Sequence, residues 1–280
     1  MPEKRTLTTK TCSSVNIVNY KQIYQYIPMK SYCITLRGND SRQKSTADAL
    51  KDVQVDFEFF IGVDARVDEH PLLSRIHNKK FLYNMGRPHA IGEVGCYASH
   101  YLVWQKCVEL NQPILVFEDH VDIDSELFIN TLSIAKRHIN QCGFIRLQDS
   151  KNKLFYSVEK NENNQQLVKY LKVPQGTACY AISPDAARAF IKHNSTFKYP
   201  VDVFLRNTWV HKQPMFGVRQ AGLQRSQQPS IIGNRKYKDK KNYFVATMKI
   251  LNKVKSMVFN LATNIYHLFS LSIEYRPKLK

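Results

Sequence analysis

The sequence lacks the motifs that mark several common nucleotide-binding and hydrolytic enzymes. It has no P-loop, no G-x-G-x-x-G after the first predicted strand and no G-x-S-x-G. Phosphate-loop kinases, dinucleotide-dependent dehydrogenases and serine hydrolases would therefore be without their central residues. No internal repeat and no low-complexity tract is present either, which argues against a solenoid.

Paired cysteines and a leading apolar run are also missing. The six cysteines are scattered, and none forms a C-x-x-C pair. This usage fits reduced cytosolic thiols and argues against a disulfide scaffold or a zinc site. No apolar segment follows the charged residues 1–6, so we expect no secretory signal. With 280 residues, the chain is long enough for one large domain, or for one domain and a tail.

Acidic residues are scarce, with 23 Asp and Glu against 41 Lys and Arg and a formal net charge of +18. A nucleic-acid-binding protein, a peripheral membrane enzyme, or an enzyme of sugar nucleotides and phosphorylated glycolipids could carry this excess. No known nucleic-acid-binding signature is found, so the last two are favoured. Much of the excess lies near the C-terminus, at Arg235, Lys236, Lys238, Lys240, Lys241, Lys249, Lys253, Lys255, Arg276, Lys278 and Lys280.

The hydrophobic pattern predicts an α/β fold with a mixed, mainly parallel central sheet flanked by helices. Strand, helix and strand follow one another over residues 31–63, which predicts parallel pairing through a right-handed crossover. Residues 66–90 are expected to be irregular. The other predicted strands are 113–118, 143–147, 153–158 and 165–173. The first predicted helix has Asp40 or Ser41 as its N-cap, two more span 91–110 and 125–140, another follows Ser183 as N-cap, and the last begins at Asn242.

Metal-seeking side chains follow one of the predicted buried strands. Residues 113–117 form a short apolar run, and Glu118, Asp119 and His120 come directly after it. In open α/β sheets, ligands bind where strands end. Two carboxylates and an imidazole there can hold a divalent cation, and the mixture of oxygen and nitrogen donors suits Mn²⁺ better than Ca²⁺. An acidic turn with no ligand is the alternative.

This stretch and five others resemble glycosyltransferase family 25, the lipopolysaccharide and lipooligosaccharide sugar transferases. Gly92–His100 matches the family's Gly-Glu-x-Gly-Cys-x-x-Ser-His, and Glu118–His120 matches its Glu-Asp-Asp. The remaining matches, in order over residues 31–232, are Ser31–Leu36 with Arg42, Phe57–Asp64, Gly176–Pro184 and Pro200–Asp202. Two residues depart from the pattern: His120 stands where the family usually has Asp, and Thr35 where it has Asn.

The resemblance implies a GT-A-like single domain over residues 31–235, with an N-terminal extension at 1–30 and a basic amphipathic helical segment at 236–280. It also implies a nucleotide-sugar site. Arg42 would meet the diphosphate or the base, since Arg offers bidentate donors to phosphate, and Asp64 would accept from ribose or uracil. Solvated or turn positions are the alternatives for both. The remaining donor-site residues would be Thr35, Leu36, Ser99, His100, Glu118, Asp119, Gly176 and Thr177.

The cation would be held by Glu118, Asp119 and His120, with His211 as a candidate further ligand. The alternative for His211 is a surface or core histidine, and for His100 a core histidine. The family is regarded as inverting, which requires a carboxylate base for the acceptor hydroxyl. Asp202, in the Pro-x-Asp match, is the first choice, with a helix N-cap as the alternative role. Asp149 is the second choice.

The resemblance implies an inverting, metal-dependent hexosyltransferase that uses Mn²⁺ or Mg²⁺ and a UDP-sugar, and UDP-galactose as the best guess for the donor rests on the resemblance alone. The acceptor would be a lipooligosaccharide core. We expect no nucleic-acid partner and allow for an oligomer. The basic C-terminal helix would hold the enzyme on the cytoplasmic face of the bacterial inner membrane, or would pack on the protein. A degenerate transferase acting as a scaffold is the main alternative, and a nucleic-acid-binding protein the weaker one.

Overall fold

A computed structural model of the chain describes residues 29–150, 155–162, 164–226 and 242–269. Its strands are β1 (Lys30–Thr35), β2 (Glu58–Ile61), β3 (Ile114–Glu118), β4 (Val121–Ile123), β5 (Phe144–Arg146), β6 (Phe155–Glu162), β7 (Gln165–Lys172), β8 (Cys179–Ile182), β9 (Phe216–Arg219) and β10 (Leu223–Arg225). Its helices are α1 (Asp40–Asp52), the 3₁₀ turn η1 (Pro71–Arg75), α2 (Asn78–Met85), α3 (Ile91–Leu110), α4 (Ser125–Cys142), α5 (Pro184–Lys192), α6 (Val201–Arg206), α7 (Thr208–His211) and α8 (Tyr243–Phe269).

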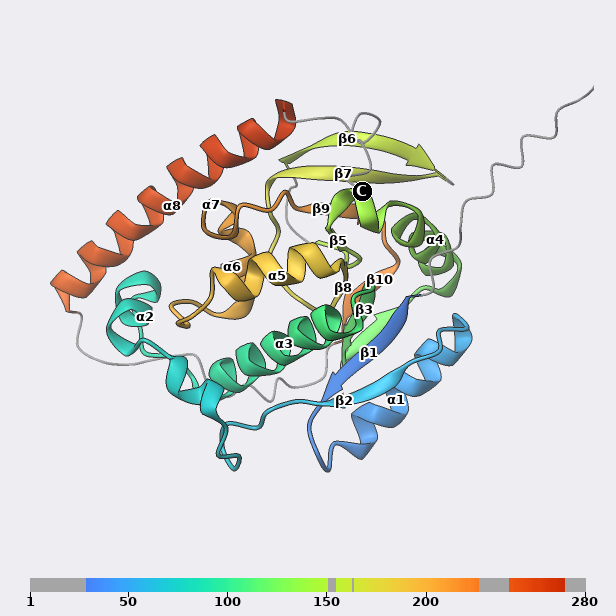
Figure 1. Cartoon of the computed structure of the whole chain (residues 1–280), viewed down its shortest axis with the longest axis horizontal. Helices are drawn as coiled ribbons and strands as arrows, with labels where there is room; N and C mark the ends of the chain where they lie inside the picture. Colours follow the sequence, from blue (N-terminus) through green and yellow to red (C-terminus); the bar gives the residue numbers. More distant parts are fainter. Residues whose placement is uncertain (1–28, 151–154, 163, 227–241, 270–280) are drawn as a thin grey trace, which may run out of the picture.

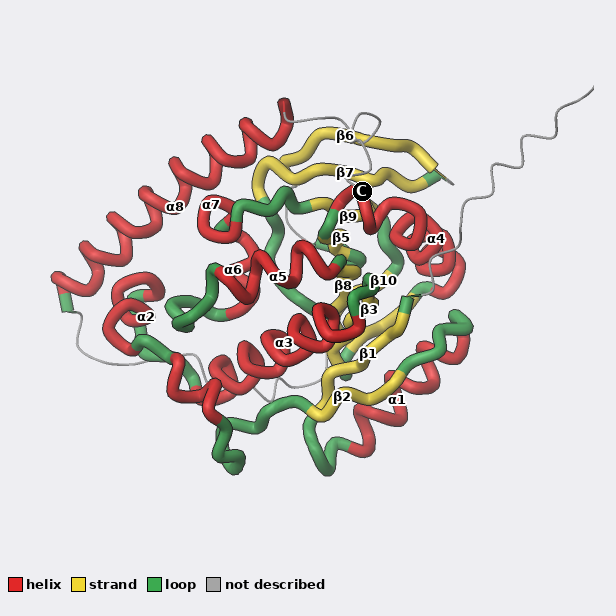
Figure 2. The backbone as a smooth tube through the Cα atoms, in the orientation of Figure 1, coloured by secondary structure: helices red, strands yellow, loops and turns green. Residues whose placement is uncertain are grey.

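One mixed sheet runs through the molecule in the order β2-β1-β3-β8-β5-β9-β7-β6 (Figures 1 and 2). As predicted, β1 and β2 pair in parallel around α1, and β3 pairs in parallel with the other side of β1. Strand β8 runs antiparallel to both of its neighbours, β3 and β5. Among the described strands of this sheet, three pairings are parallel and four antiparallel, so parallel pairings are fewer than we expected.

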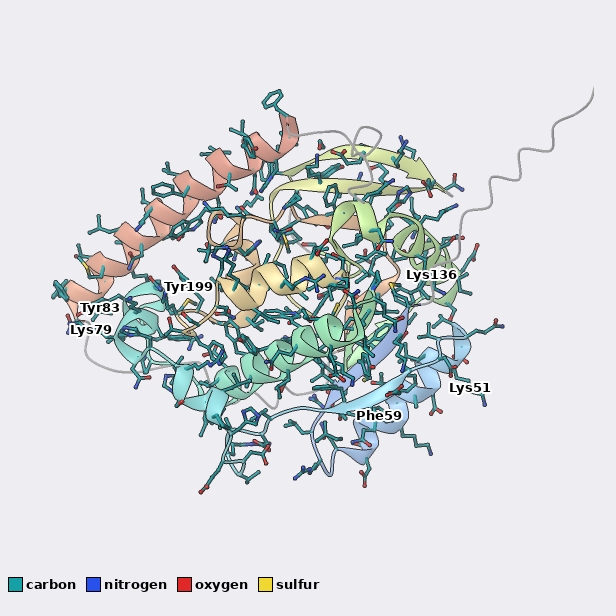
Figure 3. The ribbon with its side chains drawn as sticks, viewed as in Figure 1. Lys51, Phe59, Lys79, Tyr83, Lys136 and Tyr199 are labelled. Atoms are coloured by element: carbon teal, nitrogen blue, oxygen red, sulfur yellow. The ribbon has the colours of Figure 1, made fainter. Side chains whose placement is uncertain are left out.

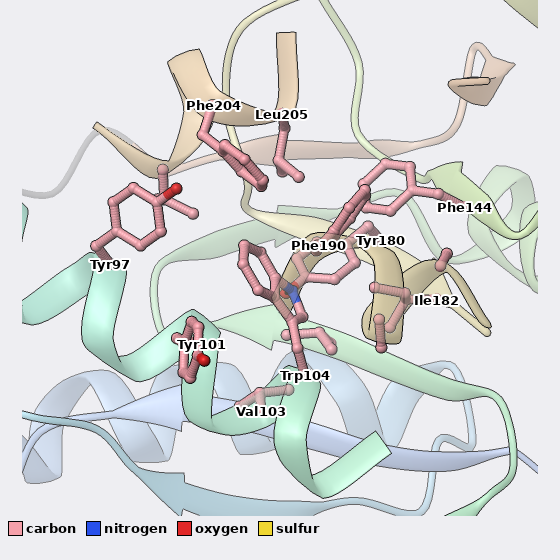
Figure 4. Close-up of a cluster of buried hydrophobic side chains, with 14 of the residues drawn as sticks. Tyr97, Tyr101, Val103, Trp104, Phe144, Tyr180, Ile182, Phe190, Phe204 and Leu205 are labelled. Carbon is pink, nitrogen blue, oxygen red and sulfur yellow. The ribbon is translucent and has the colours of Figure 1, made fainter. Parts of the chain in front are cut away.

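Helices cover both faces of the sheet because the central strands are apolar on both sides. In β3, Ile114 and Val116 face the core beneath α3 and α5, while Leu115 and Phe117 face the core beneath α1 and α4. Figure 4 shows the first core, where the fully buried Trp104 of α3 packs on Phe190 and Phe204. This architecture of a mixed sheet between helices agrees with the GT-A-like fold that the resemblance implied.

Several local predictions are confirmed and others are corrected. The helix at 91–110 is confirmed, and Ser183 caps α5 by accepting a hydrogen bond from the Ala186 amide. Residues 66–90 are not irregular throughout, because η1 and α2 lie within them. The N-cap of α1 is Asn39 instead of Asp40 or Ser41. The predicted extension at 1–30, the start of the strand at 153 and the boundary at 235 fall wholly or mostly outside the described residues.

Helix α8 packs on α2, α7 and β7 (Figure 1), and its polar side faces inward. Asparagines spaced four or eight residues apart make the contacts: the side-chain amides of Asn252, Asn260 and Asn264 donate to Tyr83 O at 3.3 Å, Asn207 Oδ1 at 3.1 Å and Leu171 O at 2.8 Å. The outward side is apolar, and Figure 3 shows its side chains pointing away from the domain. The exposed residues include Phe244, Ile250, Leu251, Val254, Met257, Val258, Leu261 and Phe269. No helix in the described part of the chain has the length and apolarity needed to cross a bilayer.

Candidate active site

An open pocket lies where the three parallel strands β1, β2 and β3 end. Strand ends of this kind are where open α/β sheets bind ligands. Most of the residues predicted for the donor site line it. The lining residues are Ile34, Thr35, Leu36, Arg42, Val63, Asp64, Ala65, Arg66, Gly92, Cys96, Ser99, His100, Glu118, Asp119, His120 and Arg225.

Asp119 faces the β1 side of this cavity. Its Oδ2 accepts hydrogen bonds from Thr35 Oγ1 at 2.7 Å and Asn39 Nδ2 at 2.9 Å, and its Oδ1 lies 3.3 Å from Arg42 Nη1. Burial would raise the pKa of Asp119, but the nearby His120 ring, the hydrogen bonds from Thr35 and Asn39 and the charge of Arg42 outweigh it and lower that pKa. The ionised carboxylate therefore fixes the Arg42 guanidinium at the cavity wall.

Glu118 faces the opposite side. Thr177 Oγ1 donates to its Oε1, and Arg225 Nη2 donates to its Oε2 at 2.9 Å. The His100 Nε2 atom lies 3.4 Å from Oε1. Burial would raise the pKa of Glu118, yet His100 and the charges of Arg225 and His120 hold it well below the usual range. A charged carboxylate is thus buried at the centre of the site.

His120 and Arg225 meet because two short strands pair across the cavity mouth. In the antiparallel pair β4–β10, Val121 lies opposite Arg225, and the Ser226 amide donates to His120 O at 2.9 Å. This register brings Arg225 Nε into a hydrogen bond with His120 Nε2. The guanidinium therefore bridges His120 and Glu118, and it adds a cation to the site that the sequence motifs did not predict.

The turn after β2 forms the far wall. Ser99 Oγ accepts from the Val63 amide at 2.8 Å, and a Cβ at Gly95 would come within 2.5 Å of Val63 O. Only glycine lets α3 approach this turn so closely. Asp64 pairs with Arg66, with 2.5 Å between its Oδ2 and Arg66 Nη2, and these hydrogen bonds lower the pKa of Asp64 despite partial burial. Asp64 thus lines the cavity and is paired with the guanidinium of Arg66.

Five predicted residues lie outside the lining of the cavity, and His211 is one of them. Thr177 Oγ1 donates to Glu118 Oε1, and the carbonyl of the preceding Gly176 accepts from Arg146 Nη1 at 2.6 Å. Asp149 has both carboxylate oxygens occupied, by the amides of Ala221 at 2.7 Å and Gly222 at 3.2 Å. This contact makes Asp149 a support for the turn before β10. Asp202 lies in the first turn of α6, and Pro200 is the N-cap there, so Asp202 does not have the capping role.

The prediction of His211 as a metal ligand is wrong. Its ring is fully buried against Phe190 and Phe204, its Nε2 lies 3.1 Å from Leu205 O, and its Nδ1 accepts from the Gln213 amide at 3.2 Å. Both ring nitrogens therefore have partners within the core. The structure bears out the alternative of a core histidine.

The remaining predicted ligands come together in part. His120 Nε2 lies 3.5 Å from Glu118 Oε2, whereas the carboxylate of Asp119 is turned toward Thr35, Asn39 and Arg42. Carboxylate and imidazole donors suit a divalent transition cation, so Glu118 and His120 fit one. Asp119 instead fits the role of orienting Arg42.

Sequence reasoning missed Asn39 and Arg225 as members of the site, and it did not assign Cys96 a place there. Asn39 sits in a loop whose only visible signal was helix capping. Arg225 lies outside the six matched stretches, and the β4–β10 pairing is what brings it near Glu118. Cys96 did stand within the Gly92–His100 motif, one helical turn before His100, and that spacing was the available signal.

Comparison with known proteins gives a family match. The model of glycosyltransferase family 25, described as a lipopolysaccharide biosynthesis protein family, matches residues 29–205. A glycosyltransferase 25 family member of Aedes aegypti is 35% identical over 32% of this chain and 16% of its own. Lipooligosaccharide biosynthesis protein lic2B of Haemophilus influenzae is 27% identical over 58% of this chain and 62% of its own. Procollagen galactosyltransferase 1-A of Xenopus laevis is 27% identical over 41% of this chain and 20% of its own. In each case the match spans less than two thirds of the relative's length.

Proposed function

Because the chain belongs to glycosyltransferase family 25, we propose that it transfers a hexose from a nucleotide sugar to a lipooligosaccharide acceptor. UDP-galactose is the proposed donor and an inverting displacement the proposed reaction. The observation that carries this proposal is the cavity at the ends of β1, β2 and β3, with Arg42 and Arg225 fixed by Asp119 and Glu118.

These cations suit a diphosphate. Arg42 is buried and held by Asp119, and Arg225 reaches the same cavity from β10. Guanidinium groups bind phosphate oxygens with two parallel hydrogen bonds. Thr35, Leu36, Asp64, Ser99 and His100 complete the proposed donor site. Of these, Asp64 would accept from the ribose or the base at the exposed rim.

A divalent cation, Mn²⁺ or Mg²⁺, is the proposed cofactor, and Glu118 and His120 are the predicted ligands that could hold it. Bound there, it would neutralise the leaving diphosphate. The protein's own contribution is to keep Glu118 ionised and to place Arg225 beside it. Glu118 and Arg225 are therefore already in this arrangement before any ligand binds.

The displacement needs a base for the acceptor hydroxyl, and Asp202 is proposed for that role. The acceptor oxygen would bond to the anomeric carbon, the bond to the diphosphate would break, and the proton would pass to the carboxylate. The Asp202 charge acts on two arginines outside the cavity lining: it helps to raise the pKa of Arg87 after the main effect of Glu93, and it opposes the burial that lowers the pKa of Arg146. Asp149 is the weaker candidate because its oxygens are already bonded to two amides.

The acceptor glycolipid suggests a membrane surface, and α8 offers a face for it. The outward side of α8 is apolar, and Lys249, Lys253 and Lys255 lie on the same helix. An apolar face with lysines on its flanks suits a surface rich in anionic lipid headgroups. We therefore propose a location on the cytoplasmic face of the bacterial inner membrane. The basic residues 235–241 and 276–280 lie outside the described residues.

One observation favours a second candidate, a binding subunit without turnover. Arg225 bonds to both Glu118 and His120, and it partly neutralises the residues proposed to hold the cation. A protein of this kind would bind a UDP-sugar and release it unchanged.

The test is a screen of UDP-sugars for transfer or hydrolysis with Mn²⁺, comparing the wild type with Glu118→Ala and Asp202→Asn. Turnover should fall by roughly 10²–10⁴-fold in Asp202→Asn, as expected for loss of a general base, and should also fall sharply in Glu118→Ala. Asp185→Asn is the matched control, because Asp185 also lies in the first turn of a helix and its side chain is 92% exposed.

Donor binding without turnover in the wild type would favour the binding subunit. Full activity in Asp202→Asn would assign the base elsewhere, and absence of both binding and turnover with every UDP-sugar would refute the proposed function.

A further inference from the structure

Three side chains on the floor of the cavity surround one point. Cys96 and His100 are one turn apart on α3, and Glu118 ends β3 directly opposite. Among residues 29–150, 155–162, 164–226 and 242–269, these three form a group whose ligand atoms all lie within 4.8 Å of one another. All three line the cavity. His100 Nε2 lies on the Oε1 side of Glu118, whereas Arg225 and His120 lie at Oε2.

The spacing of the donor atoms suits a small tetrahedral ion. Two ligand atoms at about 2.0–2.1 Å from a tetrahedral zinc ion stand about 3.3 Å apart. His100 Nε2 and Glu118 Oε1 are 3.4 Å apart. An ion could therefore be accommodated between these two atoms with little movement of either side chain.

An orphaned ring nitrogen points to the same place. The side chain of His100 is 1% exposed, and within the described residues its Nε2 makes no hydrogen bond of regular geometry, with Glu118 Oε1 at 3.4 Å as a charged neighbour. Burying a polar nitrogen without a partner is unfavourable, and such groups in native structures call for an explanation. Binding of an ion by the Nε2 lone pair would remove this cost.

The surrounding hydrogen bonds resemble those that orient metal ligands. His100 Nδ1 lies 2.9 Å from Tyr180 Oη, which also accepts from Trp104 Nε1 at 3.1 Å. With Nδ1 donating to Oη, the lone pair of Nε2 faces Glu118. Thr177 in turn donates to Glu118 Oε1. Partners of this kind fix the tautomer of a ligating imidazole and the rotamer of a ligating carboxylate.

We propose that Cys96, His100 and Glu118 bind a zinc-class transition-metal ion. The thiolate is a soft ligand and selects zinc over Mn²⁺ or Mg²⁺. Three protein ligands leave the fourth position open toward the cavity, as in catalytic zinc sites. The open position could polarise a phosphate or hydroxyl oxygen. This last role depends on the proposed transferase function, but the binding of the metal does not.

The experiment loads the full-length protein with Co²⁺ under reducing conditions and records the thiolate-to-cobalt charge-transfer absorption. The wild type should bind one Co²⁺ with this band, and Zn²⁺ should displace it. Cys96→Ser should lose the band and bind Zn²⁺ at least about 10-fold more weakly, since loss of even an orienting partner costs about 10–100-fold.

Cys107→Ser is the matched control. Cys107 lies on the same helix, is buried, and its thiol donates to Ile182 O at 3.6 Å, a bond that serine can keep. Cys107→Ser should retain the band. Co²⁺ bound without a thiolate band, or a band that survives Cys96→Ser, would overturn the proposal.

A second measurement does not depend on how the variants fold. Zn²⁺ should slow alkylation of Cys96 in the wild type, as mapped on the Cys96 peptide, and equal rates with and without Zn²⁺ would contradict the site. Because Co²⁺ binding and sugar transfer are separate readouts, a thiolate band without transfer refutes the transferase and keeps the metal site. Sugar transfer without the thiolate-to-cobalt band would refute the metal site and keep the transferase.

Discussion

At the scale of single residues, neighbours in the sequence serve opposite sides of one cavity. Glu118 is the last residue of β3 and Asp119 follows it, yet Glu118 contacts Thr177 and Arg225 whereas Asp119 contacts Thr35, Asn39 and Arg42. Successive side chains of a strand alternate in direction, so a Glu-Asp pair at a strand end holds two cations apart. We infer that each carboxylate orients its own arginine toward the donor diphosphate.

His211 gives a prediction for pH. Burial lowers the pKa of His211 to about 3 from an ordinary value of 6.5. Below pH 6.5 the unfolded chain binds a proton that the folded chain does not, so stability is lost as the pH falls. Between pH 7 and pH 5 this residue should remove about 2 kcal/mol of unfolding free energy.

Urea unfolding of the wild type and of His211→Gln at the two pH values measures this effect. The loss of stability on acidification should be smaller in His211→Gln by that amount. His193→Gln, which removes an exposed imidazole, is the control and should keep the wild-type dependence. Equal losses in wild type and His211→Gln would refute the assignment.

The sequence predicted the site residues that belong to recognisable motifs. It missed those that a distant part of the chain brings into the site. Glu118, Asp119, Ser99, His100 and Arg42 were predicted for the site and all line the cavity. Arg225 could not be predicted, because its place depends on the pairing of two three-residue strands. His211 was misassigned because a histidine between aromatic rings looks the same in sequence as one at a surface.

At the scale of elements, helix signals were reliable where the helix was long. The apolar spacing of α3 gave its bounds, residues 91–110. Helix α2 has only eight residues and is capped by the ring of His77, which accepts from the Lys80 amide at 3.3 Å. Ser, Thr, Asp or Asn is the usual cap, so the start of α2 carried no recognisable signal.

The polar contacts of α8 give a second prediction. Asn260 Oδ1 accepts from Thr208 Oγ1 at 3.2 Å, and its Nδ2 donates to Asn207 at 3.1 Å. Asn260→Ala should lower the free energy of unfolding by about 1–3 kcal/mol, because partly buried polar partners lose their bonds. Val258→Ala, on the exposed side of the same helix, should stay within about 0.5 kcal/mol of the wild type. Similar effects in the two variants, measured by chemical denaturation, would contradict the inward orientation of the asparagines.

At the scale of the whole molecule, apolar surface and positive charge occur together on α8. The chain carries a net charge of +18, and the outer side of α8 leaves Leu251 and Val258 each 55% exposed. Soluble monomers rarely expose a continuous apolar patch of this kind without a partner. An anionic lipid surface could contact both the apolar side chains and the positive charges of this helix.

Sedimentation with anionic vesicles tests this proposal. Leu251→Ser should weaken binding by roughly 10-fold, since loss of about 1.4 kcal/mol of apolar burial corresponds to that factor. Ile129→Ser removes an apolar side chain of similar exposure, 50%, from α4 and is the control. Binding should weaken with added salt and on neutral vesicles. Equal affinities of the two variants, or insensitivity to salt, would refute the proposed face.

The position of β8 between β3 and β5 has a consequence for biosynthesis. Strand β3 ends at residue 118, and its partner β8 begins at residue 179, so about 60 residues must be made before that edge is covered. At a translation rate of about 5–20 residues per second, the edge of β3 stays unpaired for roughly 3–12 s while the ribosome makes these residues. During this interval the nascent chain exposes backbone groups that can pair with another strand. Slower translation of residues 119–178 should therefore increase aggregation. A chaperone that binds the nascent chain on the ribosome should reduce it.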